Sequence, residues 1–100
     1  MESVYQRALK IELELLDLRC EGAVQKEIYY EHQLIGTKRL DLLVDNEILL
    51  ELKAVRELDH SCTNQVLNYL KVFDLEVGLL FNFGKDSLEF KRYVHHRKSV

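Results

Sequence analysis

The chain contains no proline, only four glycines and no long hydrophobic run. Its turns are therefore sparsely marked, and no linker, repeat or low-complexity segment is evident. No apolar segment approaches the roughly 18–20 residues of a membrane span, and the first residues lack the pattern of a signal peptide. At 100 residues, the sequence predicts one domain in the cytoplasm, with no membrane partner.

Cysteine and basic charge are also scarce. The two cysteines, Cys20 and Cys62, have neither the spacing of a metal site nor that of a disulfide framework, so we interpret them as buried thiols. Lysine and arginine number 14 against 17 acidic residues, which gives a net charge of −3. Strong nonspecific DNA binding usually requires a basic surplus, because it depends on neutralising phosphates. This balance still allows an acidic metal site flanked by local lysines.

The apolar pattern predicts two helices and five strands. The helical period runs through residues 2–19 and 62–73, whereas runs of β-forming residues occupy 23–35, 38–45, 48–55, 77–83 and 88–94. The resulting order, α-β-β-β-α-β-β, predicts a mixed sheet with helices packed on it, an α/β or α+β fold.

Glycine and polar residues indicate how these elements end. Gly22 follows the first helix at the position of a C-cap, and Thr63 is a candidate N-cap for the second. The run 23–35 best fits one strand, with a break at a bend near Tyr30 as the alternative, and Gly36 and Thr37 predict a turn before the next strand. Residues 45–47 predict a three-residue hairpin loop.

This hairpin places charged residues inside the most hydrophobic segment of the chain. With a loop of residues 45–47, Val44 pairs with Ile48, and Asp41 then lies opposite Glu51. Their Cβ atoms would be about 4.5–5.5 Å apart. A two-residue loop would instead put the two carboxylates on opposite faces.

Glu51 and Lys53 are two residues apart on one strand, so they share a face. Directly opposed carboxylates destabilise a sheet unless something compensates their charge, and a divalent cation such as Mg²⁺ could do so. Lys53 could then orient a water molecule or stabilise charge that develops on a phosphate. The alternative is a salt-bridge ladder on a solvated face of the hairpin, and these three residues alone leave both interpretations open.

The ordered motifs resemble those of a known family. An Asp, nine residues, then Glu-x-Lys, followed by a helix with Gln-x-x-x-Tyr, is similar to the PD-(D/E)-x-K nuclease superfamily and, within it, to the GxxExxY family. The resemblance covers nearly the whole chain through ESVYQRALKIEL (2–13), RLDLLVDNEILLELKAV (39–55), NQVLNYLK (64–71), VGLLFNFG (77–84) and LEFKRYV (88–94).

The resemblance implies a restriction-endonuclease-like central mixed sheet flanked by helices, with a metal-dependent site. Its metal ligands would be Asp41, Glu51 and the Leu52 carbonyl, and its ion Mg²⁺ or Mn²⁺. Lys53 would be the catalytic lysine, Gln65 would line the site, and the helix carboxylate Glu2 would complete it.

Further residues are candidates for contact with nucleic acid, and we expect that nucleic acid to be DNA. They are Lys38, Arg39, Tyr69 and Lys71. Tyr69 lies one helical turn from Gln65, so it either hydrogen-bonds into the site or packs against the sheet. The glycine that opens the family motif would precede Met1, so we expect a single domain over residues 1–100 that is N-terminally short relative to the family. The hydrophobic surface left open could be covered by another chain, in a homo-oligomer.

Two functions follow from this sequence. The first is a Mg²⁺-dependent deoxyribonuclease that hydrolyses phosphodiesters. The alternative is a catalytically inactive module that keeps the nuclease fold and acts as a nucleic-acid-binding or oligomerisation scaffold.

Overall fold

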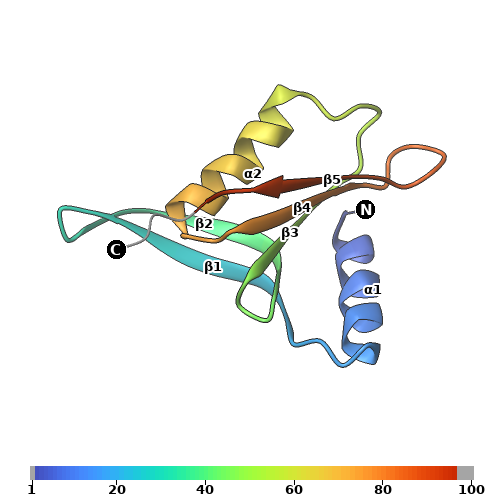
Figure 1. Cartoon of the computed structure of the whole chain (residues 1–100), viewed down its shortest axis with the longest axis horizontal. Helices are drawn as coiled ribbons and strands as arrows, with labels where there is room; N and C mark the ends of the chain where they lie inside the picture. The colour runs from blue at the N-terminus through green and yellow to red at the C-terminus, as the bar shows by residue number, and fades with distance from the viewer. Residues whose placement is uncertain (1, 97–100) are drawn as a thin grey trace.

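A five-stranded sheet carries one helix on each face in the computed structural model, which describes residues 2–96 (Figure 1). The elements are α1 (Glu2–Leu15), β1 (Cys20–Tyr30), β2 (Gln33–Val44), β3 (Ile48–Lys53), α2 (His60–Val72), β4 (Val77–Asn82) and β5 (Glu89–Val94). This order is the one predicted from the sequence. Within the described residues, neither helix is long and apolar enough to cross a membrane.

The sheet is mixed, as predicted. Its strand order is β1-β2-β3-β4-β5, and β3 and β4 are parallel whereas every other neighbouring pair is antiparallel. Parallel neighbours need a crossover connection, and α2 provides it. The β1–β2 hairpin extends beyond both helices at one side of the molecule (Figure 1).

Side chains alternate along β3 and build a core on each face. Leu49 joins the cluster under α2, which includes Leu43, Val66, Leu70 and Leu80. Leu50 and Leu52 join the cluster under α1, together with Leu42, Val44, Leu9 and Leu13. Cys62 is buried in the first cluster and Cys20 in the second, and both are free thiols, as predicted. The predicted alternation of β3 is therefore confirmed.

The turn between β1 and β2 does not lie at Gly36 and Thr37, where the sequence predicted it. The chain turns instead at Glu31 and His32, which have positive φ angles of 50° and 64°, and Gly36 lies inside β2. A two-residue loop with both residues in the left-handed region matches the twist of a hairpin. Glutamate and histidine are not the usual residues of such a loop, so the sequence indicated a bend near Tyr30 only as an alternative and assigned the turn to Gly36 and Thr37.

The residues that end α1 and begin α2 also differ from the predictions. The first helix ends at Leu15, and the left-handed residue after it is Asp17 with φ 65°, not Gly22. Gly22 lies within β1. The N-cap of α2 is Asp59, whose carboxylate accepts hydrogen bonds from the N–H groups of Ser61 and Cys62.

The β2–β3 hairpin has the predicted register. Val44 pairs with Ile48, Leu43 with Leu49, and Leu42 with Leu50, around a loop of residues 45–47. Asp41 and Glu51 follow next on their strands. The hairpin therefore brings the two acids to the same level of the sheet, as the sequence predicted.

Candidate metal-binding and catalytic site

The strands β2 and β3 part where the two acids lie. The backbone ladder ends at Leu42 and Leu50, whereas β3 goes on pairing with β4 as far as Lys53. Two carboxylates take the place of the missing backbone partners. The N–H of Asp41 donates to Glu51 Oε1 at 3.3 Å, and the N–H of Leu52 donates to Asp41 Oδ2 at 2.8 Å.

Glu51 is buried, with only 3% of its surface exposed. Burial, followed by the negative charge of Asp41, raises the pKa of Glu51 to about 8. Within the described part of the chain, no ion pair involves this carboxylate. A buried acid beside a second acid binds a proton at neutral pH, or it binds a cation that replaces the proton.

Lys53 lies beside this pair at the end of β3. Its positive charge acts on Glu51 and lowers the pKa of that carboxyl, although burial and Asp41 outweigh it. The Lys53 carbonyl accepts a hydrogen bond from the Phe83 N–H at 2.8 Å, on the β4 side. Because carbonyls alternate along a strand, the Leu52 carbonyl is directed toward the β2 side, where the Leu52 N–H meets Asp41.

The N-terminal turns of α1 lie over Asp41. A hollow of about 250 Å³ is lined by Glu2, Ser3, Gln6, Ala23, Arg39 and Asp41. The structure thus brings Glu2, which is far from Asp41 in sequence, to the same hollow as Asp41 and its near neighbour Arg39.

Gln65 and Tyr69 come from α2, on the face of the sheet that carries Glu51 and Lys53. The amide of Gln65 donates to the Tyr69 hydroxyl at 3.1 Å, and Tyr69 is 7% exposed within the core cluster under α2. Tyr69 therefore packs against the sheet, as one of its two predicted roles required, and also bonds Gln65, while the place of both residues in the site stays a prediction. Its contact with nucleic acid stays a prediction, and it would have to act through Gln65.

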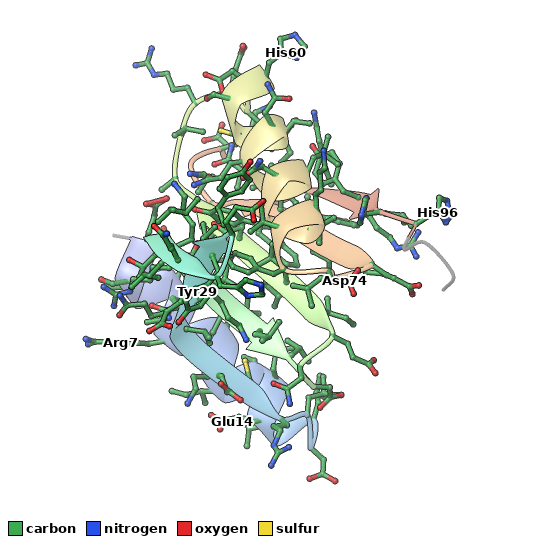
Figure 2. All side chains as sticks on the ribbon, turned by 90° about the vertical axis from the view of Figure 1, so that its left-hand side faces the viewer. Arg7, Glu14, Tyr29, His60, Asp74 and His96 are labelled. Carbon is green, nitrogen blue, oxygen red and sulfur yellow. The ribbon has the colours of Figure 1, made fainter. Side chains whose placement is uncertain are left out.

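The predicted basic contacts lie on two elements, β2 and α2. Lys38 is exposed on β2, next to Arg39. Lys71 is in the last turn of α2, six residues or about 9 Å along the helix from Gln65. His60 projects outward at the start of α2 (Figure 2). Arg39 thus shares a hollow with Asp41, Lys38 precedes it on β2, and Lys71 lies toward the C-terminal end of α2.

Two residues that support this site were not identified from the sequence. Gln6 donates from its side-chain amide to the Asp41 carbonyl at 2.9 Å, and its position one helical turn after Glu2 is the signal that could have revealed it. Asn82 is fully buried and bonds both the N–H and the carbonyl of Val55, at 3.0 and 2.8 Å. It is the one polar residue in the apolar run 77–83, a pattern that already indicates a specific partner.

A larger hollow of about 680 Å³ lies elsewhere. It is lined by residues of the β2–β3 loop and of the α2–β4 connection, including Asp45, Glu47, Phe73 and Leu75, and by none of the predicted site residues. Size therefore does not mark the candidate site. Paired acids, burial and a raised pKa mark it instead.

The residues present suit a small hard cation. Within residues 2–96, no three His, Cys, Asp or Glu side chains gather as a ready metal cage. Mg²⁺ does not require one, because it is typically held by one or two carboxylates, waters and substrate phosphates. Asp41 and Glu51 supply two carboxylates, and the Leu52 carbonyl is directed to the same side. The buried charge of Glu51 is what such a cation would neutralise.

Comparison with known proteins agrees with this fold. The family model of the PD-(D/E)XK nuclease superfamily matches residues 1–93, so the chain belongs to that superfamily. The crystal structure of SSO0001 has a TM-score of 0.70 to this chain at 21% sequence identity, which shows a shared fold. That match covers 97% of this chain and 52% of SSO0001, so the chain spans about half of SSO0001. No curated protein matches the sequence.

Proposed function

We propose that the protein is a nuclease that uses Mg²⁺ or Mn²⁺ to hydrolyse DNA phosphodiesters, within the GxxExxY group of its superfamily. The observation that carries this proposal is the pairing of Asp41 with the buried Glu51, whose pKa is raised to about 8. A surface salt-bridge ladder would be solvated and would leave that pKa near its usual value. Superfamily membership supports the same function.

The roles follow from the positions of the side chains. Asp41, Glu51 and the Leu52 carbonyl would hold the cation, which supplies Lewis-acid stabilisation of the phosphate. Lys53, beside them, would stabilise the negative charge that builds on the phosphoryl oxygens. Gln65 would orient the attacking water, and Glu2 would adjust the charge of the site from across the hollow.

The reaction is the hydrolysis of one P–O bond of the phosphodiester. The water oxygen forms a bond to phosphorus, and the opposite bond from phosphorus to the sugar oxygen breaks. One proton of the water ends on the departing sugar oxygen, and the new phosphate monoester keeps the negative charge.

The basic residues would contact the DNA. Lys38 and Arg39 would contact its backbone near the scissile phosphate, and Lys71 would contact it farther along α2. Tyr69 would support Gln65.

Cleavage of supercoiled plasmid tests this function directly. Purified protein should nick the plasmid in Mn²⁺ or Mg²⁺ and not in EDTA, and Asp41→Asn should abolish nicking while leaving the protein folded. Asp86→Asn, at an exposed position of the β4–β5 turn, is the matched control and should cleave normally. Equal cleavage by wild type and Asp41→Asn would reject the proposal.

A second candidate function, an oligomerisation scaffold, is favoured by the outer face of α1. Its exposed apolar residues repeat at spacings of four, three and four, which is the spacing of a helix–helix seam: Val4, Ala8, Ile11 and Leu15. The partner we propose is a second copy of this chain. Antiparallel pairing of the two α1 helices would place Arg7, which extends outward in Figure 2, beside Glu14 of the second copy.

Sedimentation of the whole chain tests the scaffold. Wild type should be a dimer at high micromolar concentration and Ile11→Glu a monomer, because the charge would lie in the seam. Glu12→Lys, on the exposed helix surface beside the seam, controls for a change of charge alone. A monomeric wild type would reject the scaffold without affecting the nuclease proposal.

A further inference from the structure

The β1–β2 ladder is interrupted opposite Asp41. Gly22 pairs with Leu42 and Val24 with Leu40, but the residue between them, Ala23, has a φ of 52°. A left-handed angle is unusual for alanine, and it turns the backbone out of the pattern of an extended strand. The Asp41 carbonyl accepts its hydrogen bond from the Gln6 side chain instead, at 2.9 Å.

The space between Gln6 and Gly22 is tight. A Cβ added to Gly22 would lie 3.0 Å from Gln6 Nε2, tighter than nine in ten Cβ contacts, so the Gln6 amide would have to shift. A Cβ added to Gly36, farther along the hairpin, would meet nothing within 4 Å. Neither glycine has a positive φ, so alanine at either position avoids the strain of a left-handed backbone, and the two positions differ in the space around them.

The same helical turn has a second anchor. The ring of Tyr5 stacks on that of Phe83, with centroids 4.4 Å apart and planes 6° from parallel. Phe83 follows β4, and its N–H bonds the carbonyl of Lys53. The turn that carries Glu2 is thus fixed on both sides, to Asp41 through Gln6 and to the end of β3 through Tyr5.

We propose that Gln6 is a positioning residue for the metal site, which holds the Asp41 backbone so that its carboxylate stays in the gap between β2 and β3. Because Glu2 and Gln6 are one helical turn apart and line the same hollow, the same bond holds Glu2 over Asp41. The part of this inference that concerns metal binding rests on the proposed function, whereas the positioning of Asp41 does not.

Hydrogen exchange at the Leu52 amide tests the positioning, because this N–H donates to Asp41 Oδ2. Gln6→Met keeps the size of the side chain and removes the donor. We expect the Leu52 amide to exchange about tenfold faster, relative to the Leu80 amide in the core, which reports overall opening. Unchanged relative exchange at Leu52 would overturn the inference, whether or not the protein binds a metal.

Gly22→Ala gives an independent route to the same result, in case Gln6→Met does not fold. It should also speed exchange at Leu52 by displacing Gln6, whereas Gly36→Ala, the matched control, should not. Equal effects of the two glycine variants would contradict the role of Gln6.

Titration with Mn²⁺ tests the part of the inference that concerns metal binding. If wild type is stabilised by Mn²⁺, Gln6→Met should raise the Mn²⁺ concentration at half-effect about tenfold, the usual scale for residues that orient ligands. In the Glu2→Gln background the same change should have a smaller effect, since both act on one site. No change in the Mn²⁺ midpoint would overturn this part. A wild type without any Mn²⁺ response would reject the proposed function and leave the Leu52 result to decide on Gln6.

Discussion

Asp41 and Glu51 are joined by a bond from backbone to side chain: the Asp41 N–H donates to Glu51 Oε1 at 3.3 Å, whereas in a regular sheet this N–H would have a backbone acceptor. The exchange of a backbone acceptor for a carboxylate opens the sheet locally and directs two acids into the opening. It also brings two like charges together in a place with little solvent. Each of these consequences can be measured.

The raised pKa of Glu51 predicts an unusual dependence of stability on pH. Glu51 titrates near 4.5 when unfolded and at about 8 when folded, so the folded protein holds the proton more tightly. Without divalent cations, the free energy of unfolding should fall as pH rises through this window, by up to about 1.4 kcal/mol per pH unit. Thermal melts in EDTA at pH 5, 6, 7 and 8 would measure the slope.

The variant Glu51→Gln isolates this effect. It should remove most of the slope and melt above wild type at pH 8, because no charge remains to be buried. Glu47→Gln, in the exposed hairpin loop, should keep the wild-type slope. If Glu51→Gln retains that slope, another group is responsible for it.

Divalent cations should reverse the pH effect. A cation bound at Asp41 and Glu51 replaces the proton, so Mn²⁺ should raise the melting temperature more at pH 8 than at pH 5. At a hundred times the dissociation constant, the gain in stability is about 2.7 kcal/mol. Asp41→Asn should lose this gain, and a wild-type melt that ignores Mn²⁺ at both pH values would contradict the site.

Loss of the Lys53 charge should affect catalysis more than folding. Lys53→Met keeps the aliphatic stem, so the melting temperature should stay near that of wild type. Single-turnover cleavage in Mn²⁺ should slow by about 10²–10³-fold, the cost of removing one group that stabilises transition-state charge. Lys26→Met, on β1, provides the control for loss of one lysine. A Lys53→Met variant with wild-type rates would remove Lys53 from the mechanism.

Asn82 should be important for stability in any functional interpretation. Its side chain bonds the N–H and carbonyl of Val55 and the N–H of Gly84. Asn82→Leu would leave these backbone groups without that partner, at a cost of about 2–4 kcal/mol in urea unfolding. The exposed Asn68 on α2 offers the comparison, because Asn68→Leu should change stability by less than about 0.5 kcal/mol.

The hairpin register could be predicted from the sequence because it depends on local rules. A three-residue loop and strict alternation fix which residues face each other, so Asp41 and Glu51 came together as expected. The turn at Glu31 and His32 could not be predicted in the same way. Either residue can adopt a positive φ, but the propensity is weak and the pairing of long strands decides the turn.

The residues that hold the acids in position were harder to predict, because they act through contacts between distant segments of the chain. Gln6 is 35 residues from Asp41, and the bond between them exists only because Ala23 leaves the ladder. Nothing in the sequence indicates a left-handed alanine within a strand. Patterns of one strand or one helix could therefore identify the charged groups, but not the residues that hold them in place.

The placement of the two free thiols has a practical consequence. Cys20 lies in the layer between the sheet and α1, and Cys62 in the layer between the sheet and α2. An alkylating reagent reaches each thiol only when its own layer opens, so the two labelling rates report separately on the detachment of the two helices. The natural sequence thus carries one chemical probe for each side of the sheet, and no engineered label is needed to learn which side opens first.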